Sequence, residues 1–202
     1  GWTKQACDDI ERFAVANHLP VGCAFRRQDL LDNRHDHYVG DVGIGINPVL
    51  SERVRMADVL MLVGTRLGEM ASSGYTLIDS PVPRQKLVHV HAAGEELGRV
   101  YQPELAIHAG PAAFAAAAAA LTPVENPPWK GAVAEARADY LAWTGRREIP
   151  GRVQMWEIVD YLNQKCPEGI YTNGAGNFAT WLHRFHRYSG LRSQLAPTSG
   201  AM

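Results

Sequence analysis

The stretch Asp58-Val59-Leu60-Met61-Leu62-Val63-Gly64 is the clearest strand in this sequence. Every position between its first and last residue is apolar, which is typical of a strand in a parallel sheet covered on both faces. Further strands are predicted at Leu87–His91 and Leu105–Ile107, and the alanine-rich segment Pro111–Leu121 predicts a helix after the third strand. Strands that alternate with helices indicate parallel βαβ units. We therefore predict an α/β fold built on a Rossmann-like parallel sheet with flanking helices.

The segment that precedes this strand continues the alternation. Apolar residues spaced through positions 6–19 predict a helix that ends at Pro20, and Val21–Phe25 predicts a short buried strand. Asn47-Pro48 predicts the start of another helix, because Asn is a favoured cap and Pro fits a first turn. Between them, Asp29–Gly45 is predicted to be a loop. Its glycines at 40, 43 and 45 are spaced like part of a dinucleotide-binding loop, but no strand is predicted to lead into them.

A second glycine-containing turn lies near the end of the chain. Thr122–Pro128 has the composition of a linker, and helices are predicted at Trp129–Trp143 and around 153–162. Ile170–Trp181 then predicts a buried strand, a glycine turn and a helix that opens on Asn177. Such a turn directs backbone N–H groups and the positive end of a helix to one place, which suits a phosphate. Glycines placed there only for tight packing remain the alternative.

Composition excludes several classes of protein. The 202 residues carry a formal net charge of −1, which gives no indication of nucleic-acid or anionic-membrane binding. No apolar run is long enough to span a bilayer. The three cysteines form no C-x-x-C pattern, so they are interpreted as small buried thiols of a cytoplasmic protein.

Two segments together carry a family resemblance. The turn at Gly174–Phe178 and the ending Leu195–Met202 resemble the start of the diphosphate-binding domain of thiamine-diphosphate enzymes of the acetolactate synthase, pyruvate oxidase and benzoylformate decarboxylase type. Leu19-Pro20-Val21, Gly64-Thr65-Arg66 and Glu96-Leu97-Gly98 are similar to successive landmarks of the central domain of that family. The resemblance implies a central Rossmann-like domain at 1–121 without its first strand, a linker at 122–128, and the truncated front part of a second α/β domain at 129–202.

The resemblance also implies a cofactor and the residues that hold it. The full-length parent would use thiamine diphosphate and Mg²⁺. The cofactor-binding residues would be Gly174, Ala175, Gly176, Asn177 and Phe178 against the diphosphate, the Gly200 carbonyl as acceptor for the 4′-amino group, and Met202 as an apolar wedge. No catalytic residue or metal ligand is expected in this chain, because the activating glutamate and the Gly-Asp-Gly…Asn metal motif lie outside it. A helix cap for Asn177 and a core position for Met202 are the alternatives.

The activity implied is that of a carboligase or 2-oxo-acid decarboxylase, a lyase or transferase that acts on a pyruvate-like 2-oxo acid or an aldehyde. A homodimer or homotetramer is implied, and the 202-residue chain alone is expected to be inactive.

FAD binding is doubtful, because His91, Ala93 and Gly110 stand where FAD-binding relatives carry acidic residues. A nucleotide-binding module for FAD or NAD and a ligand-free scaffold remain alternatives. For Arg66, an ion pair with Glu69 or Asp79 is favoured over a nucleotide phosphate.

Three groups of histidines are possible sites. His35 and His37, with Asp32 and Asp36, favour a solvated loop over a metal site. His89 and His91 point to one side of a strand near its carboxyl end, where ligands bind in open α/β sheets, although an ordinary structural role is favoured. His183 and His186 are predicted to have a surface or interface role.

Overall fold

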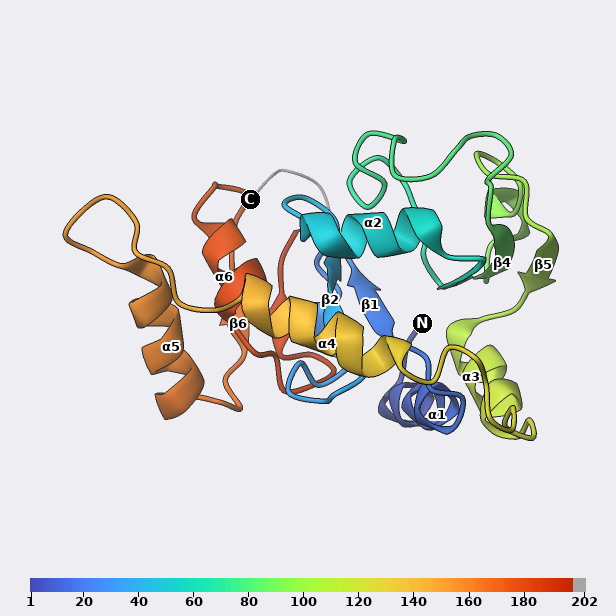
Figure 1. The fold of residues 1–202 in the computed structure, drawn as a ribbon, viewed down its shortest axis with the longest axis horizontal. Helices are drawn as coiled ribbons and strands as arrows, with labels where there is room; N and C mark the ends of the chain where they lie inside the picture. Colours follow the sequence, from blue (N-terminus) through green and yellow to red (C-terminus); the bar gives the residue numbers. More distant parts are fainter. Residues whose placement is uncertain (198–202) are drawn as a thin grey trace.

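Every strand in the described part of the chain is paired in parallel. The computed structural model describes residues 1–197. β1 (Val21–Ala24) pairs with β2 (Tyr38–Val42), and a separate sheet has the order β3 (Val59–Val63), β4 (Lys86–His91), β5 (Leu105–His108). A third, short pair joins β6 (Tyr171–Thr172) to β7 (Gln194–Leu195). With helices packed around these sheets, the predicted α/β class with parallel strands is confirmed (Figure 1).

Of the α-helices in residues 1–197, those that start at Lys4 and Pro48 follow a residue whose side chain caps them. The α-helices are α1 (Lys4–Ala16), α2 (Pro48–Met56), α3 (Pro111–Ala119), α4 (Ala132–Trp143), α5 (Met155–Lys165) and α6 (Ala179–Phe185), with short 3₁₀ turns η1 (Gln28–Leu30) and η2 (Gly94–Glu96). The Thr3 hydroxyl accepts from the Ala6 N–H at 3.1 Å, and Asn47 caps α2 through the Val49 N–H at 3.0 Å, as its sequence predicts. α1 ends at Ala16, before the Pro20 that was expected to stop it.

The molecule is elongated, with the β3–β4–β5 sheet at one end and α5 at the other (Figure 1). The β1–β2 pair lies between them, and both α2 and α4 pack on β2. α1 packs against α3. The largest cluster of buried apolar side chains lies against the three-stranded sheet and includes Leu62, Leu77, Leu87 and Tyr101. Val42, at the end of β2, packs against the same cluster and so links the two sheets.

One strand lies inside the segment that was predicted to be a loop. β2 occupies Tyr38–Val42 and leads directly into Gly43, so the expectation of a loop throughout 29–45, with no strand before its glycines, is wrong. The sequence does not predict this strand because it contains Gly40 and Asp41, and both residue types are depleted in strands. In the structure Asp41 is partly buried, with Oδ2 shielded from solvent and without a partner among the described residues, and burial raises the pKa of its carboxyl to about 7.

The second difference concerns β3. Its apolar sequence predicted cover on both faces, but Val59 is 56% exposed and Met61 is 37% exposed. Leu62, on the opposite face, is buried in the core. Among the described residues β3 is also an outer strand of its sheet, so it has the sequence of an interior strand and the position of an edge strand.

The predicted linker is fastened to the end of α1. Residues 122–128 contain no helix or strand, as their composition predicts. The Asn17 side chain accepts from the Val124 N–H at 3.1 Å, and the Trp129 indole N–H donates to the Asn17 carbonyl at 2.8 Å. In the part of the chain that the structure describes, no helix is long and apolar enough to cross a membrane.

Candidate functional site

The glycine turn lies at the carboxyl end of a parallel strand pair. β6 leads into residues 173–178, which are followed by α6, so the order of strand, turn and helix is as the sequence predicts. The strand is not buried as expected, because Ile170 is 64% exposed and Thr172 is also exposed. β7 runs beside β6 in the same direction, and the Asn173 N–H donates to the Leu195 carbonyl at 3.2 Å. Because carboxyl ends of parallel strands meet at one edge, the segment after Leu195 starts next to the turn. The two segments that carry the family resemblance therefore begin side by side.

The turn presents backbone rather than side-chain donors. Within residues 1–197, the N–H groups of Gly174 to Phe178 have no hydrogen-bond acceptor, and residues 175–178 are exposed. A Cβ on Gly176 would come within 2.7 Å of the Phe178 ring, so this glycine allows the ring to fold over the turn. A row of N–H groups without acceptors is of the kind that can bind an anion. Gly200 and Met202, predicted to complete the site, lie outside the described residues.

The helix after the turn differs in detail from its prediction. α6 begins at Ala179 with Phe178 as its N-cap residue, and the Asn177 side chain makes no capping hydrogen bond. Instead, the Asn177 carbonyl accepts from the Thr180 hydroxyl at 2.6 Å. Since α6 has only seven residues, the N–H groups of the turn offer more to an anion than the helix dipole does.

Buried polar pairs hold the segment that bears the turn against the N-terminal part of the chain. Gln28 and Gln194 bond reciprocally: the Gln28 N–H donates to Gln194 Oε1 at 3.0 Å, and Gln194 Nε2 donates to Gln28 Oε1 at 2.8 Å. Gln28 Nε2 also donates to the His183 carbonyl, in α6, at 2.6 Å. These contacts fix both β7 and α6 relative to η1.

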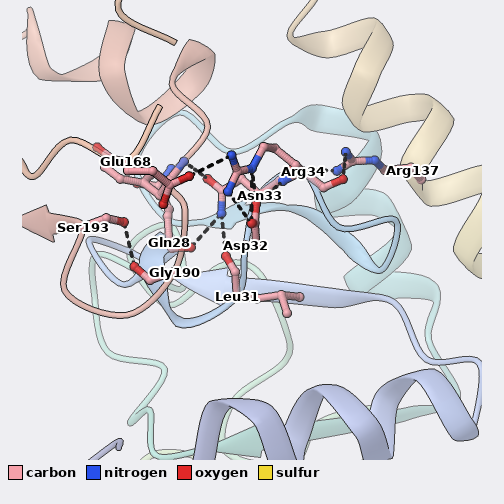
Figure 2. Close-up of polar contacts among 10 residues, drawn as sticks. Gln28, Leu31, Asp32, Asn33, Arg34, Arg137, Glu168, Gly190 and Ser193 are labelled. Atoms are coloured by element: carbon pink, nitrogen blue, oxygen red, sulfur yellow. Dashed lines mark hydrogen bonds and ion pairs between the residues drawn. The ribbon is translucent and has the colours of Figure 1, made fainter. Parts of the chain in front are cut away.

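Asn33 provides the second attachment. Its backbone N–H donates to the Tyr188 carbonyl at 2.9 Å, and its Oδ1 accepts from the Tyr188 N–H at 3.2 Å. Arg34 lies between Asp32 and Glu168, and Arg137 of α4 donates to the Asn33 carbonyl at 3.0 Å (Figure 2). The segment that bears the glycine turn is therefore held in place by hydrogen bonds and ion pairs to residues 28–34, which lie far from it in the sequence.

A separate cavity of about 580 Å³ opens at the carboxyl ends of the other strands. His89 and His91 line it together, as their shared side of the strand predicts, with ring centroids 6.0 Å apart. Charged and phenolic side chains make up much of the remaining wall: Arg27, Arg66, Glu69, Tyr75, Glu96, Arg99 and Tyr101. Tyr75, Arg99 and Tyr101 were not identified from the sequence, because they come from loops that carry no recognisable pattern.

The charges of this cavity are largely paired internally. Arg66 lies 3.8 Å from Glu96 and Arg99 lies 3.0 Å from it, so the predicted partner of Arg66, Glu69 or Asp79, is wrong. His89 Nε2 bonds the Thr65 carbonyl at 2.9 Å and is therefore the protonated nitrogen. Burial lowers the pKa of His89, and its Nδ1 has no partner among the described residues. The cavity wall therefore presents one buried hydrogen-bond acceptor, His89 Nδ1, and two guanidinium groups that both pair with the Glu96 carboxylate.

His35 and His37 make structural hydrogen bonds. His35 accepts from the His37 N–H at 3.1 Å, and His37 Nδ1 donates to the Leu19 carbonyl at 2.8 Å. Among residues 1–197, no group of three or more His, Cys, Asp or Glu side chains is placed to hold a metal ion.

His183 and His186 are buried rather than on the surface, with exposures of 7% and 1%. His183 packs edge-on against Phe25, and the His186 ring contacts the Tyr171 ring at a tilt of 44°. The cysteine interpretation holds for Cys7 and Cys23, which are buried, whereas Cys166 is exposed.

Comparison with known proteins gives one clear match. Residues 1–118 match the family model described as "Thiamine pyrophosphate enzyme, central domain". This span contains β1 to β5 and the cavity at their carboxyl ends. No curated protein matches the chain.

Proposed function

Because the chain belongs to the thiamine pyrophosphate (thiamine diphosphate) enzymes through its central domain, we propose that it is part of a carboligase or 2-oxo-acid decarboxylase. The enzyme would require Mg²⁺ and act on a pyruvate-like 2-oxo acid or an aldehyde. Thiamine diphosphate, when bound, supplies a carbon nucleophile and an electron sink for such substrates. We further propose that the enzyme is a cytoplasmic homodimer or homotetramer.

The observation that carries the proposal is the glycine turn at Gly174–Phe178. Its N–H groups are exposed and lack acceptors within residues 1–197, and it lies at the shared carboxyl edge of β6 and β7. These features fit a diphosphate, which accepts several N–H hydrogen bonds at once. In this proposal the turn holds the diphosphate, and the contacts of Gln28 and Asn33 hold the turn in place.

The chain by itself is proposed to be inactive. Its sequence contains no Gly-Asp-Gly…Asn motif to bind the metal, and residues 1–197 contain no cluster of potential metal ligands. The substrate-binding and proton-transfer groups would have to come from other parts of the enzyme. Turnover of pyruvate by the purified 202-residue chain, with thiamine diphosphate and Mg²⁺ added, would contradict this part of the proposal.

Backbone amide NMR of the 202-residue chain tests the role of the turn. Titration with inorganic diphosphate, and separately with thiamine diphosphate, is expected to shift the amide signals of residues 174–178, whereas thiamine without phosphate leaves them unchanged. Gly176→Ala should weaken the shifts, because the new methyl group displaces the Phe178 ring from the turn. Gly131→Ala is the matched control, since a Cβ there meets only Glu135 at 4.0 Å. Unchanged turn signals with both diphosphates would refute the assignment.

The cavity lined by His89 and His91 supports a second candidate, a nucleotide held by the central domain. Its volume of about 580 Å³ suits a small ligand, and Arg66 and Arg99 could contact a phosphate. Glu96 already pairs with both, however, and would have to release one of them. The same NMR experiment with ADP, FAD and NAD separates the two candidates, because a nucleotide here shifts the signals of Gly64–Arg66 and leaves those of the glycine turn unchanged.

A further inference from the structure

Arg26 is an arginine at a backbone position that suits glycine. It is the third residue of the turn Ala24–Arg27, which follows β1 and is closed by the Arg27 N–H on the Ala24 carbonyl at 2.9 Å. The φ angle of Arg26 is +58°, and a turn with a positive φ at its third residue favours glycine or asparagine. A left-handed conformation is costly for other residues and persists where the surroundings fix it. The backbone therefore gives no reason for an arginine here, so the reason lies in its side chain.

That side chain reaches the segment that follows β7. Arg26 is buried, and its guanidinium lies 4.7 Å from the centre of the Phe25 ring. One guanidinium nitrogen, Nη1, donates to the Pro197 carbonyl, and hydrogen bonds from a cation are among the stronger ones in proteins. Burial lowers the pKa of His183 in α6, and the nearby Arg26 charge lowers it further. The guanidinium thus lies between the helix after the glycine turn and the segment after β7.

Pro197 stands between the two segments that the family resemblance assigns to the cofactor. Two residues before it, the Leu195 carbonyl accepts from the Asn173 N–H, at the start of the glycine turn, at 3.2 Å. Three residues after it comes Gly200, which lies outside the described residues and is predicted to accept from the 4′-amino group of thiamine diphosphate. Because proline fixes its own φ, a hydrogen bond at Pro197 sets the direction in which the chain leaves β7.

We propose that Arg26 is a positioning residue for the thiamine end of the cofactor, because it holds the segment after β7 in place through the Pro197 carbonyl. The role rests on the proposed function and adds to it a residue from the part of the chain that matches the family's central domain. Recognition of the diphosphate by the glycine turn does not require Arg26. The two ends of the cofactor should therefore respond differently when its side chain is removed.

Arg26→Gly removes the side chain and keeps the turn, because glycine adopts a positive φ without steric cost. Arg192→Gly is the matched control. It makes the same change at a second arginine of positive φ, +73°, which is exposed and lies two residues before β7. Both variants lose one positive charge, so a general effect of charge on anion binding appears in both.

Amide hydrogen exchange of the ligand-free chain gives the first readout. In Arg26→Gly, exchange of the Asn173 amide should become faster by about fivefold or more, because its acceptor, Leu195, is held less firmly. The Tyr171 amide donates to the Ser193 carbonyl at 2.8 Å, before β7, and is the internal reference. Equal exchange of the Asn173 amide in Arg26→Gly and in Arg192→Gly would overturn the proposal.

NMR titrations with thiamine diphosphate and with inorganic diphosphate give the second readout. In the parent chain, thiamine diphosphate should have the lower Kd. Arg26→Gly should reduce the ratio of the two Kd values by about tenfold, as expected for the loss of one charge-assisted hydrogen bond, and should leave the Kd of inorganic diphosphate unchanged. Arg192→Gly should keep the ratio of the parent.

A ratio that survives Arg26→Gly, or equal Kd values for the two ligands in the parent chain, would overturn the role of Arg26 and leave the diphosphate assignment standing. Absence of shifts at residues 174–178 with both ligands in the parent chain would refute the diphosphate assignment, and the role of Arg26 with it. The parent chain alone therefore separates failure of the proposed function from failure of the positioning role.

Discussion

Replacement of Asn33 by alanine should destabilise the fold strongly, because this side chain is 1% exposed and makes three hydrogen bonds. Its Nδ2 donates to the Gln28 and Leu31 carbonyls at 2.8 and 2.9 Å, and its Oδ1 accepts from the Tyr188 N–H at 3.2 Å. Alanine leaves these three backbone groups without their partner. At about 1 kcal/mol per bond, the expected loss is about 3 kcal/mol.

Urea and thermal unfolding, followed by circular dichroism, measure this loss. A change of about 3 kcal/mol corresponds to a fall in melting temperature of about 6–12 °C for a chain of this size. Asp32→Ala is the matched control: its carboxylate pairs with Arg34 at a half-exposed site, so its loss should be below about 1 kcal/mol. If Asn33→Ala and Asp32→Ala unfold at the same urea concentration, the support described for the glycine turn is wrong.

Two further predictions concern buried titratable groups. Burial, with Arg26 near His183 and Arg187 near His186, lowers the pKa of both histidines to about 4. The unfolded chain therefore binds these protons more readily, and the stability of the fold should decrease as pH drops from about 6.5 to about 4. The urea midpoint should depend less steeply on pH in the His183→Gln, His186→Gln double variant. An unchanged slope in that variant would contradict the reasoning. The pH dependence of stability that Asp41 contributes has the opposite sign, because the folded pKa of its carboxyl, about 7, lies above the unfolded value. Asp41→Asn should therefore be at least as stable as the parent at pH 8, and a marked destabilisation there would show that the charged carboxylate has a partner.

The sequence predicted those elements whose pattern is local. β3, β4 and α3 follow from apolar runs and a proline, and the cap of α2 follows from Asn47. β2 was missed because Gly40 and Asp41 are poor strand formers, and the strand is maintained by burial of Tyr38 and Val39 between other elements. The exposure of Val59 and Met61 in β3 was not predicted, because an apolar sequence does not show whether other elements cover both faces of the strand.

The candidate site divides in the same way. The turn at Gly174–Phe178 was predicted because glycines at close spacing leave a signal in the sequence. Its support was not, because Gln28 and Gln194 are 166 positions apart. The burial of His183 and His186 likewise arises from packing against Phe25 and Tyr171, which lie outside α6. Contacts of this kind depend on tertiary structure and leave no periodic pattern.

The reciprocal bonding of Gln28 and Gln194 has a consequence for evolution. Each amide satisfies the other in a buried setting, so a change at one position leaves a polar group of the other without a partner. Single substitutions should therefore be eliminated by selection, while paired replacements by matching apolar residues are tolerated. In descendants of a common ancestor, we expect these two positions to vary jointly, and the amide pair to be inherited or lost as a unit.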